Sequence, residues 1–487
     1  MFRLLSCANW TGRLRTDTTK SPPDHFKIID YALSSSLQSV RLSVSYQHKI
    51  IHLLASRTSE SDIAPIPFET ILFDSVEPTF GRSLPSWRRR HPEDMEHSPE
   101  VYKLEEELYH KSKELLPPLI SNFDPGAQIF AKLATDTKTG EIRIKLLGDL
   151  FVDIMANDLP VLSPHDCAGV PRITLTAIDS YIACWNNNVW LVDIVLPSSR
   201  TSIRAVLKTV RVPESGQISD DDAEWTATAL REVKTLSSLP SHPNVIPASL
   251  ALVTLKPPQG TQRTLDAHSK LIGMVVPYYS GGPYRDVGQK TDDDLKRRLR
   301  HGYEFASAVQ HTNRNGVYLG DLGLHNIALT APPPNDHIVL IDFELVPMYV
   351  NLNGPDAPEA SGHWEVSIHD GRSIYKHCET PINKSKTIRE EWAANSDALE
   401  RLEVFGVGCS LAAMVQCPVY FPWLDSFTSM SFNLHGKGPE TPRPYANTTW
   451  EAKVPQKFCD LVQRCCSYDP RDRPLLDEVV ATLEQWA

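Results

Sequence analysis

Three polar residues stand in a largely apolar stretch between residues 316 and 345. Asp321 and Asn326 lie between apolar runs, and Asp342 directly follows the strand-like run from Ile338 to Ile341. Polar side chains that enter an apolar interior require partners. A phosphoryl-transfer site supplies such partners, namely an acceptor hydroxyl and Mg²⁺. It needs one carboxylate near the hydroxyl, and an amide and a second carboxylate as ligands of the Mg²⁺ ion. The residue types and their spacing therefore favour a phosphoryl-transfer site.

The same stretch also fits a plain β-hairpin whose Asp and Asn residues cap the turns, as these residue types commonly do. Taken alone, the stretch supports the phosphoryl-transfer site and the plain hairpin about equally. The flanking segments, which would have to position the three polar residues, must decide between them.

A strand and a helix upstream supply a second pair of charges. The run Ala205–Lys208 predicts an apolar strand that ends in a lysine. The helix predicted to follow has Ser219 as its N-cap and Asp220–Asp222 at the positive end of its dipole. A buried ammonium at Lys208 needs compensation, and Glu232 on that helix is the candidate partner. Each charge by itself is more often a solvated surface group.

The order of these features resembles that of the protein kinase-like superfamily. The spacing from Asp321 to Asn326 is similar to the end of the family's H-R-D-x-x-x-x-N catalytic loop, and Asp342 stands where the D-F-G metal loop begins. The lysine strand is similar to the family's V-A-I-K strand. Three further segments resemble the H-P-N junction, the start of helix F and the D-P-x-x-R-P link: 242–246, 403–408 and 469–474.

This resemblance implies an ATP-dependent phosphotransferase that transfers the γ-phosphate of ATP to a protein hydroxyl, with ATP and Mg²⁺ as cofactors. Asp321 would be the catalytic base. Lys208, paired with Glu232, would hold the phosphates, and Asn326 and Asp342 would hold the metal. The protein substrate is left unknown.

The run from Val275 to Gly282 resembles the hinge that receives adenine, which makes Val276 and Tyr278 candidate nucleotide-binding residues. Tyrosines in this run equally fit core packing.

The predicted fold is α+β and bilobal, with a small β-rich N-lobe at 171–282 and a large helical C-lobe at 283–487. Residues 1–170 match no motif and are expected to form an additional, partly disordered N-terminal region. It contains one predicted helix, which starts at Ser98 and stops at Pro117-Pro118, and one β-hairpin between Ala127 and Leu147. The mixture of apolar residues and Ser at 28–45 is compatible with a further helix.

Four positions depart from the family pattern and leave two alternatives open. Loss of a positive clamp on a developing phosphoryl charge costs orders of magnitude in rate, which favours a pseudokinase that binds nucleotide or a partner without turnover. The G-D and D-F-E forms resemble aminoglycoside- and choline-type kinases, which favours a small-molecule kinase. The departures are a glycine-free turn at Trp185–Asn188, Leu319-Gly320 for His-Arg, Gly323 for lysine, and Glu344 for glycine.

In the family, an acidic residue closes the activation segment. The sequence leaves three candidates for it: Glu359, Glu390 and Glu391. Glu391 has the more suitable spacing to Glu403 of the predicted helix F. By resemblance, Arg473 would pair with Glu391.

Composition bounds the remaining classes of function. A chain of 487 residues favours two or more domains, and a formal charge of -11 argues against a nucleic-acid partner. Nine scattered cysteines suit reduced thiols in an intracellular protein, cytoplasmic or nuclear. No apolar run reaches the roughly 18 to 20 residues of a membrane span. The basic start at residues 1–16 weakly resembles a mitochondrial transit peptide, although an ordinary disordered start is favoured.

Overall fold

The computed structural model shows a mixed α/β protein with several sheets and helices. The chain divides into two compact units: a strand-rich unit within 2–237 and 248–278, and a helix-rich unit within 238–247 and 279–487. None of the helices in the described ranges combines the length and apolar character that a bilayer span requires. The structure describes residues 27–33, 39–46, 48–56, 110, 114–135, 142–163, 165–186, 188–197, 199, 201–210, 220–255, 269–284, 292–319, 322–343, 363–369, 372–378, 395–415, 450, 453–467 and 469–487.

The first sheet of the strand-rich unit is formed by residues from the N-terminal region. The expected helix at 28–45 is wrong, because this segment forms two antiparallel strands. Its apolar residues alternate with polar ones, and in a strand successive side chains point to opposite faces of the sheet. The hairpin predicted between Ala127 and Leu147 is confirmed. The strands are β1 (Lys27–Leu33), β2 (Ser39–Tyr46), β3 (Lys49–Ser56), β4 (Gln128–Thr135) and β5 (Ile142–Asp149).

Polar side chains on one face of this sheet are fully buried. Ser43 lies opposite His52 in the β2–β3 ladder, and the Ser43 hydroxyl is 2.9 Å from His52 Nδ1. His52 Nε2 lies 3.2 Å from Gln128 Oε1 on β4. We assign the neutral tautomer, in which Ser43 donates to Nδ1 and Nε2 donates to Gln128, because it satisfies both ring nitrogens. The polar face was not recognised from sequence, since Ser and His do not mark a buried strand.

The helix predicted from Ser98 lies mostly outside the described residues. Residues 114–120 are helical and continue through Pro117 and Pro118, so the predicted stop is wrong. Leu116 and Ile120, one turn apart, are 1% and 0% exposed. Their burial outweighs the local cost of proline.

The second sheet has the strand order β7-β11-β12-β10-β9-β8, with β6 also pairing with β12. The predicted hairpin around Trp185–Asn188 is present as β8 and β9, and the lysine strand is β10. The predicted acidic helix is α3 (Asp220–Ser238), which begins directly after Ser219. The strands are β6 (Val161–Leu162), β7 (Arg172–Ile173), β8 (Ile178–Asn186), β9 (Val189–Val195), β10 (Ser202–Thr209), β11 (Ala251–Thr254) and β12 (Ser269–Pro277).

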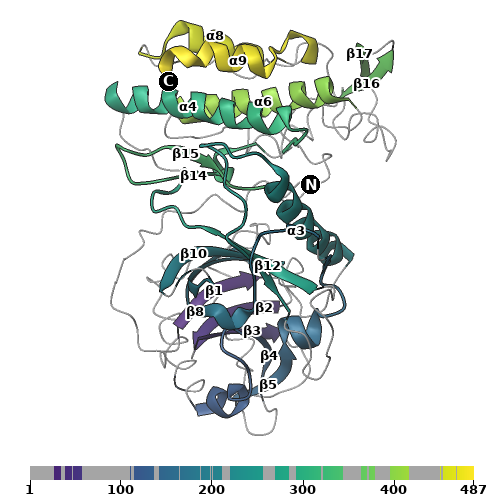
Figure 1. Ribbon diagram of the computed structural model, residues 1–487, viewed down its shortest axis with the longest axis vertical. Coiled ribbons are helices and arrows are strands. Elements are labelled where there is room, and N and C mark those ends of the chain that lie inside the picture. The colour runs from purple at the N-terminus through teal and green to yellow at the C-terminus, as the bar shows by residue number, and fades with distance from the viewer. Residues whose placement is uncertain are drawn as a thin grey trace, which may run out of the picture. The chain divides into compact units, whose positions relative to one another are not determined.

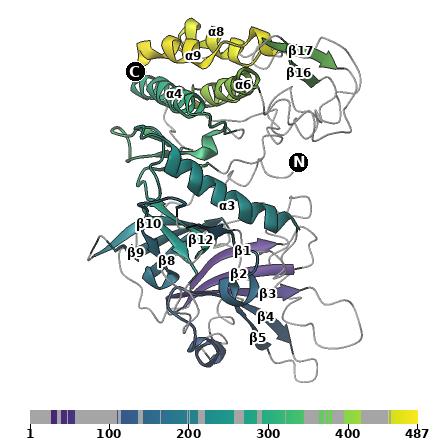
Figure 2. The same ribbon diagram turned by 45° about the vertical axis from the view of Figure 1, so that its right-hand side comes forward.

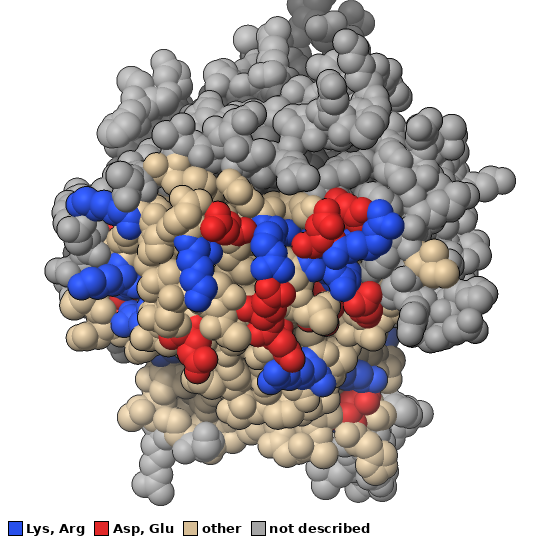
Figure 3. Space-filling model, turned by 90° about the horizontal axis from the view of Figure 1, so that it is seen from above, with Lys and Arg blue, Asp and Glu red and all other residues tan. Residues whose placement is uncertain are grey.

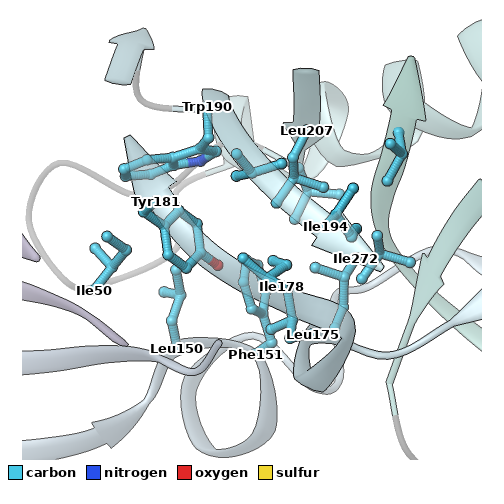
Figure 4. Close-up of a cluster of buried hydrophobic side chains, with 14 of the residues drawn as sticks. Ile50, Leu150, Phe151, Leu175, Ile178, Tyr181, Trp190, Ile194, Leu207 and Ile272 are labelled. Atoms are coloured by element: carbon cyan, nitrogen blue, oxygen red, sulfur yellow. The ribbon is translucent and has the colours of Figure 1, made fainter. Parts of the chain in front are cut away.

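One hydrophobic core joins the N-terminal region to this second sheet. Figure 4 shows Ile50, Leu150 and Phe151 beside Tyr181 and Trp190. Leu150 and Phe151 belong to a short helix, Leu150–Ile154, whose first turn is capped by the Asp149 carboxylate. The Tyr181 hydroxyl donates to Gly126 O at 2.9 Å. Residues on both sides of position 170 therefore bury one another, and the domain boundary there stays a prediction.

In the helix-rich unit, α4 and α6 form one layer and α8 and α9 the next (Figures 1 and 2). Helix α4 ends two residues before Gly316, which adopts φ +74°, a conformation that glycine tolerates without strain. Helix α6 is buried continuously from Leu402 to Val415, as expected of a central helix. The helices are α4 (Asp292–Arg314), α6 (Ser396–Val415), α8 (Gln456–Cys465) and α9 (Leu476–Leu483), followed by the 3₁₀ turn Glu484–Trp486.

Two small sheets complete this unit. Strands β13 (Gly282–Pro283), β14 (Ile327–Leu329) and β15 (Ile338–Leu340) pair in that order. Strands β16 (His363–His369) and β17 (Arg372–Cys378) form a hairpin between Asp342 and α6 in the sequence. The predicted D-P-x-x-R-P link forms a 3₁₀ turn, Pro470–Asp472, capped by Asp469.

The face shown in Figure 3 carries Lys and Arg side chains interspersed with Asp and Glu. Such exposed pairs contribute little to stability individually. In the helix-rich unit they include Arg464 with Glu478 and Arg314 with Asp477.

Close packing of α6 on α8 depends on Gly408. A Cβ at this position would lie 2.6 Å from Cys465 Cβ and 2.7 Å from Cys466 Sγ. We expect Gly408→Ala to lower the free energy of unfolding by about 1–3 kcal/mol, although alanine favours helices, because the overlap forces the helices apart. Urea denaturation measures the change.

Gly302→Ala on α4 is the matched control. Its added Cβ would meet chiefly Leu411 Cδ2, at 2.8 Å, and the end of a leucine side chain can rotate away. Equal destabilisation by both substitutions would contradict the overlap at Gly408.

Candidate functional site

Lys208 and Glu232 form a buried ion pair in the strand-rich unit. Strand β10 carries Lys208 between β9 and β12, and α3 presents Glu232 to it. Lys208 Nζ lies 2.9 Å from Oε1 and 2.8 Å from Oε2 of Glu232. The side chains are 14% and 1% exposed. The pairing expected from sequence is therefore present, with both carboxylate oxygens directed at one ammonium.

The two candidate hinge residues lie at the end of β12 in the same unit. Val276 is opposite Val206 of β10 and is buried, while Tyr278 follows the strand and is partly exposed. After them, Gly282 N donates to Tyr279 O in a turn that leads into β13. Val276 thus contributes to the core, and Tyr278 retains surface for a contact.

Asn326 and Asp342 meet at one end of the β14–β15 hairpin in the helix-rich unit. Asn326 closes a 3₁₀ turn, Leu324–Asn326, directly before β14 and is 5% exposed. Ile341 N donates to Asn326 O at 2.9 Å, and partly buried Asp342 is the next residue. The ladder register therefore places these two residues, which the sequence separates by 16 positions, at the same end of the hairpin.

These two residues carry the oxygen ligands that Mg²⁺ prefers, so the donor set fits the metal that the sequence implies. Asn326 is nearly buried at the end of a short hydrogen-bonded ladder, which limits its freedom. No cluster of three or more His, Cys, Asp or Glu side chains suited to a metal occurs among the described residues. Among the described residues, a metal here would be held by Asn326 and Asp342.

Helix α6 holds both described ends of the loop that contains Asp321. Leu319 N donates to Glu403 Oε1, and Glu403 is 1% exposed. Leu322 is buried against Gly406, where a Cβ would come 3.0 Å from Leu322 Cβ. Asp321 itself lies outside the described residues. The loop's flanks are nevertheless fixed from two consecutive turns of one buried helix.

Strand β15 is held from its other side by the segment that resembles the H-P-N junction. Asn244 Nδ2 donates to Ile338 O, Leu340 N donates to Asn244 O, and Ile246 N donates to Leu340 O, each at 2.9 Å. Asn244 N in turn donates to His242 Nδ1 at 3.2 Å. Burial, and then the neighbouring His311 ring, lower the pKa of His242, which keeps Nδ1 available as an acceptor.

Arg473 is buried in the D-P-R-D-R-P segment. Its Nε donates to Ser467 O at 2.8 Å, and its Nη1 donates to Arg401 O at 3.1 Å. Its guanidinium also lies 5.0 Å from the centre of the Phe405 ring. Glu359, Glu390 and Glu391 lie outside the described residues, so the pairing of Arg473 with Glu391 stays a prediction.

The structure thus joins Lys208 to Glu232 in the strand-rich unit and, in the helix-rich unit, places Asp342 directly after the residue whose N–H bonds to Asn326 O. Sequence reasoning missed the bond from Leu319 to Glu403. It also missed a set of buried charges on α4, although their spacing of three and four residues marks one helix face. No model of a known protein family matches the sequence.

Proposed function

We propose that this protein is an ATP-dependent phosphotransferase with a bilobal protein kinase-like fold. The observation that carries the proposal is the Lys208–Glu232 pair. A nearly buried ammonium is costly unless it is paired, and here both carboxylate oxygens lie within 3 Å of it. Such an oriented cation is suited to hold the phosphate oxygens of a nucleotide.

The β14–β15 register supports the second half of the proposal. Asn326 and Asp342 would hold Mg²⁺, and the ion when bound would neutralise charge on the transferring phosphates. Asp321 would orient the acceptor hydroxyl of a protein substrate and accept its proton. Glu403 would keep this loop in place through Leu319 N.

The glycine-free turn between β8 and β9 favours a second candidate, a pseudokinase. Asn188 follows β8 in this turn, and a side chain there hinders the close approach of backbone N–H groups to phosphate. Such a protein would bind nucleotide, or a protein partner, without transferring phosphate.

Nucleotide binding is tested on the full chain by thermal denaturation with ATP, with and without Mg²⁺. A ligand at 100 times its dissociation constant stabilises the native state by about 2.7 kcal/mol, and we expect a shift of this order that requires Mg²⁺. Asp342→Asn should abolish this Mg²⁺-dependent shift, whereas Asp477→Asn, an exposed control on α9, should retain it. Absence of any shift with ATP would contradict nucleotide binding and leave a partner-binding scaffold.

Transfer is tested with radiolabelled ATP and a generic protein acceptor. Asp321→Asn should lower the rate by about 10²–10⁴-fold, which is the usual contribution of a general base. Equal incorporation by this variant and the unmodified protein would exclude catalysis by Asp321. ATP binding without incorporation would establish the pseudokinase, and labelling of an added aminoglycoside or choline in place of protein would indicate a small-molecule kinase.

A further inference from the structure

The loop that connects β14 to β15 is fixed to α4 by one buried carboxylate. Residues 332–335 are exposed, whereas Asp336 is 0% exposed. Its carboxylate lies 3.9 Å from Arg297 Nη1, 3.9 Å from Arg300 Nη2 and 3.6 Å from His301 Nε2. Within the described residues neither carboxylate oxygen makes a hydrogen bond, so attraction between charges holds this side chain.

The backbone beside Asp336 is tied to the same helix. Arg300 Nη2 donates to Asp336 O. Glu304 accepts from Ile338 N at 2.9 Å and lies 2.6 Å from His337 Nδ1. Three consecutive residues at the start of β15 are therefore attached to one face of α4.

His301 contacts one residue beside each of the two strands that flank β14, namely Tyr284 after β13 and Asp336 before β15. Its Nδ1 lies 3.4 Å from the Tyr284 hydroxyl, and Tyr284 N donates to Ile327 O at the start of β14. Its Nε2 lies 3.6 Å from the Asp336 carboxylate, just before β15. The ring is itself 0% exposed.

The charges around His301 balance when its ring is neutral. Three carboxylates face three guanidinium groups, and a proton on His301 would add one uncompensated positive charge to a buried cluster. Burial is the main cause that lowers the pKa of His301, while Asp336 and Glu304 raise it and Arg300 lowers it. The cluster comprises Asp294, Glu304, Asp336, Arg297, Arg298 and Arg300, with the Tyr284 hydroxyl on the other side of the ring.

We propose that His301 and Asp336 are positioning residues for the metal-binding end of the β14–β15 hairpin, and that they act while His301 is neutral. The proposal rests on the proposed function, because the residues so positioned are Asn326 and Asp342. Each strand has three residues, or about 10 Å, so a shift at the clamped loop is transmitted to the opposite end of the ladder.

Hydrogen exchange tests the clamp on the full chain without nucleotide. As pH falls from about 7.5 to about 5.5, after correction for intrinsic exchange, we expect protection of the Ile338 and Leu340 amides to fall about tenfold, because the His301 ring takes up a proton when the clamp opens and its ordinary pKa near 6.5 returns. His301→Gln cannot titrate and should abolish this pH dependence, whereas His165→Gln, an exposed control, should retain it. Asp336→Asn keeps the shape of the side chain and should lower protection already at the higher pH.

Calorimetry with ATP and Mg²⁺ tests the positioning role in the same variants. The dissociation constant of the unmodified protein should rise over the same pH change, because protonation of His301 favours the open clamp, and that of His301→Gln should change little. Protection that is independent of pH, or that falls equally in His301→Gln, overturns the clamp. If amide protection depends on pH but ATP binding does not, the clamp exists and the positioning role of His301 and Asp336 is overturned. If the protein binds no ATP at either pH, the proposed function itself is overturned.

Discussion

Lys208→Met should lower the free energy of unfolding by about 3 kcal/mol or more. The substitution leaves the Glu232 carboxylate, 1% exposed, without the ammonium that lies 2.8 Å away. Removing one partner of a buried pair typically costs about 3–5 kcal/mol, because the remaining charge stays buried. Since Lys208 is 14% exposed, water reaches part of the site, and we expect the lower part of that range. Urea denaturation followed by circular dichroism measures the change.

The double variant Lys208→Met/Glu232→Leu separates the charge from the packing. Replacing both charges by apolar side chains of similar volume is often neutral or stabilising, so this variant should unfold within about 1 kcal/mol of the unmodified protein. Arg204→Met, on the same strand, removes an exposed pair with Asp193 and should cost less than about 1 kcal/mol. Additive losses in the double variant would show that Lys208 and Glu232 are not coupled. Recovery of stability without recovery of ATP binding would mark the pair as functional.

Acid should destabilise the strand-rich unit through His52. Burial, and secondarily the Arg41 charge, lower the pKa of His52 to about 3, against 6.5 for a free side chain. Between these two values the unfolded chain binds a proton that the folded chain does not, so stability falls as pH decreases. The loss is about 1.4 kcal/mol for each pH unit below about 6.5, and about 3 kcal/mol near pH 4.5.

The dependence of unfolding free energy on pH is the measurement that isolates this proton. His52→Gln lacks the titrating ring, and its slope below about pH 6 should be smaller by one proton, whatever its stability at neutral pH. Carboxylates contribute the same background slope to both proteins. His165→Gln changes an exposed histidine and should leave the slope unchanged. An identical slope in His52→Gln and the unmodified protein would show that the fold does not lower the pKa of His52.

Local sequence patterns predicted the elements with strong periodicity or clear end signals. The β8–β9 hairpin surrounds Trp185–Asn188, and Lys208 meets Glu232, because each depends on residues close in sequence or on an isolated charge. The strands at 27–46 were missed because Ser43 and other polar residues occupy a buried face. Apolar and polar residues do alternate in β2, but both kinds are buried from Arg41 to Val44, so the alternation does not separate a buried face from an exposed one.

The sequence supplied candidate residues for the site but not the contacts that support them. Asn326 and Asp342 were recognised by type and spacing, and the hairpin register brings them together. Glu403 accepts from the backbone N–H of Leu319, which is 84 positions away in sequence. Asp336 contacts the ring of His301, which is 35 positions away. Contacts of this kind depend on how helices pack, which no local pattern encodes.

The aromatic cluster around Trp190 and Tyr181 sets where this chain can be cut. A fragment starting at residue 171 would lose Ile50, Phe130 and Phe151, and would turn the indole and phenol rings they cover toward water. Exposed apolar areas of this kind promote aggregation, so such a fragment should precipitate even if its own strands form. Proteases and genetic truncations will therefore yield soluble products more readily when they spare the early strands than when they follow the boundary of the kinase resemblance.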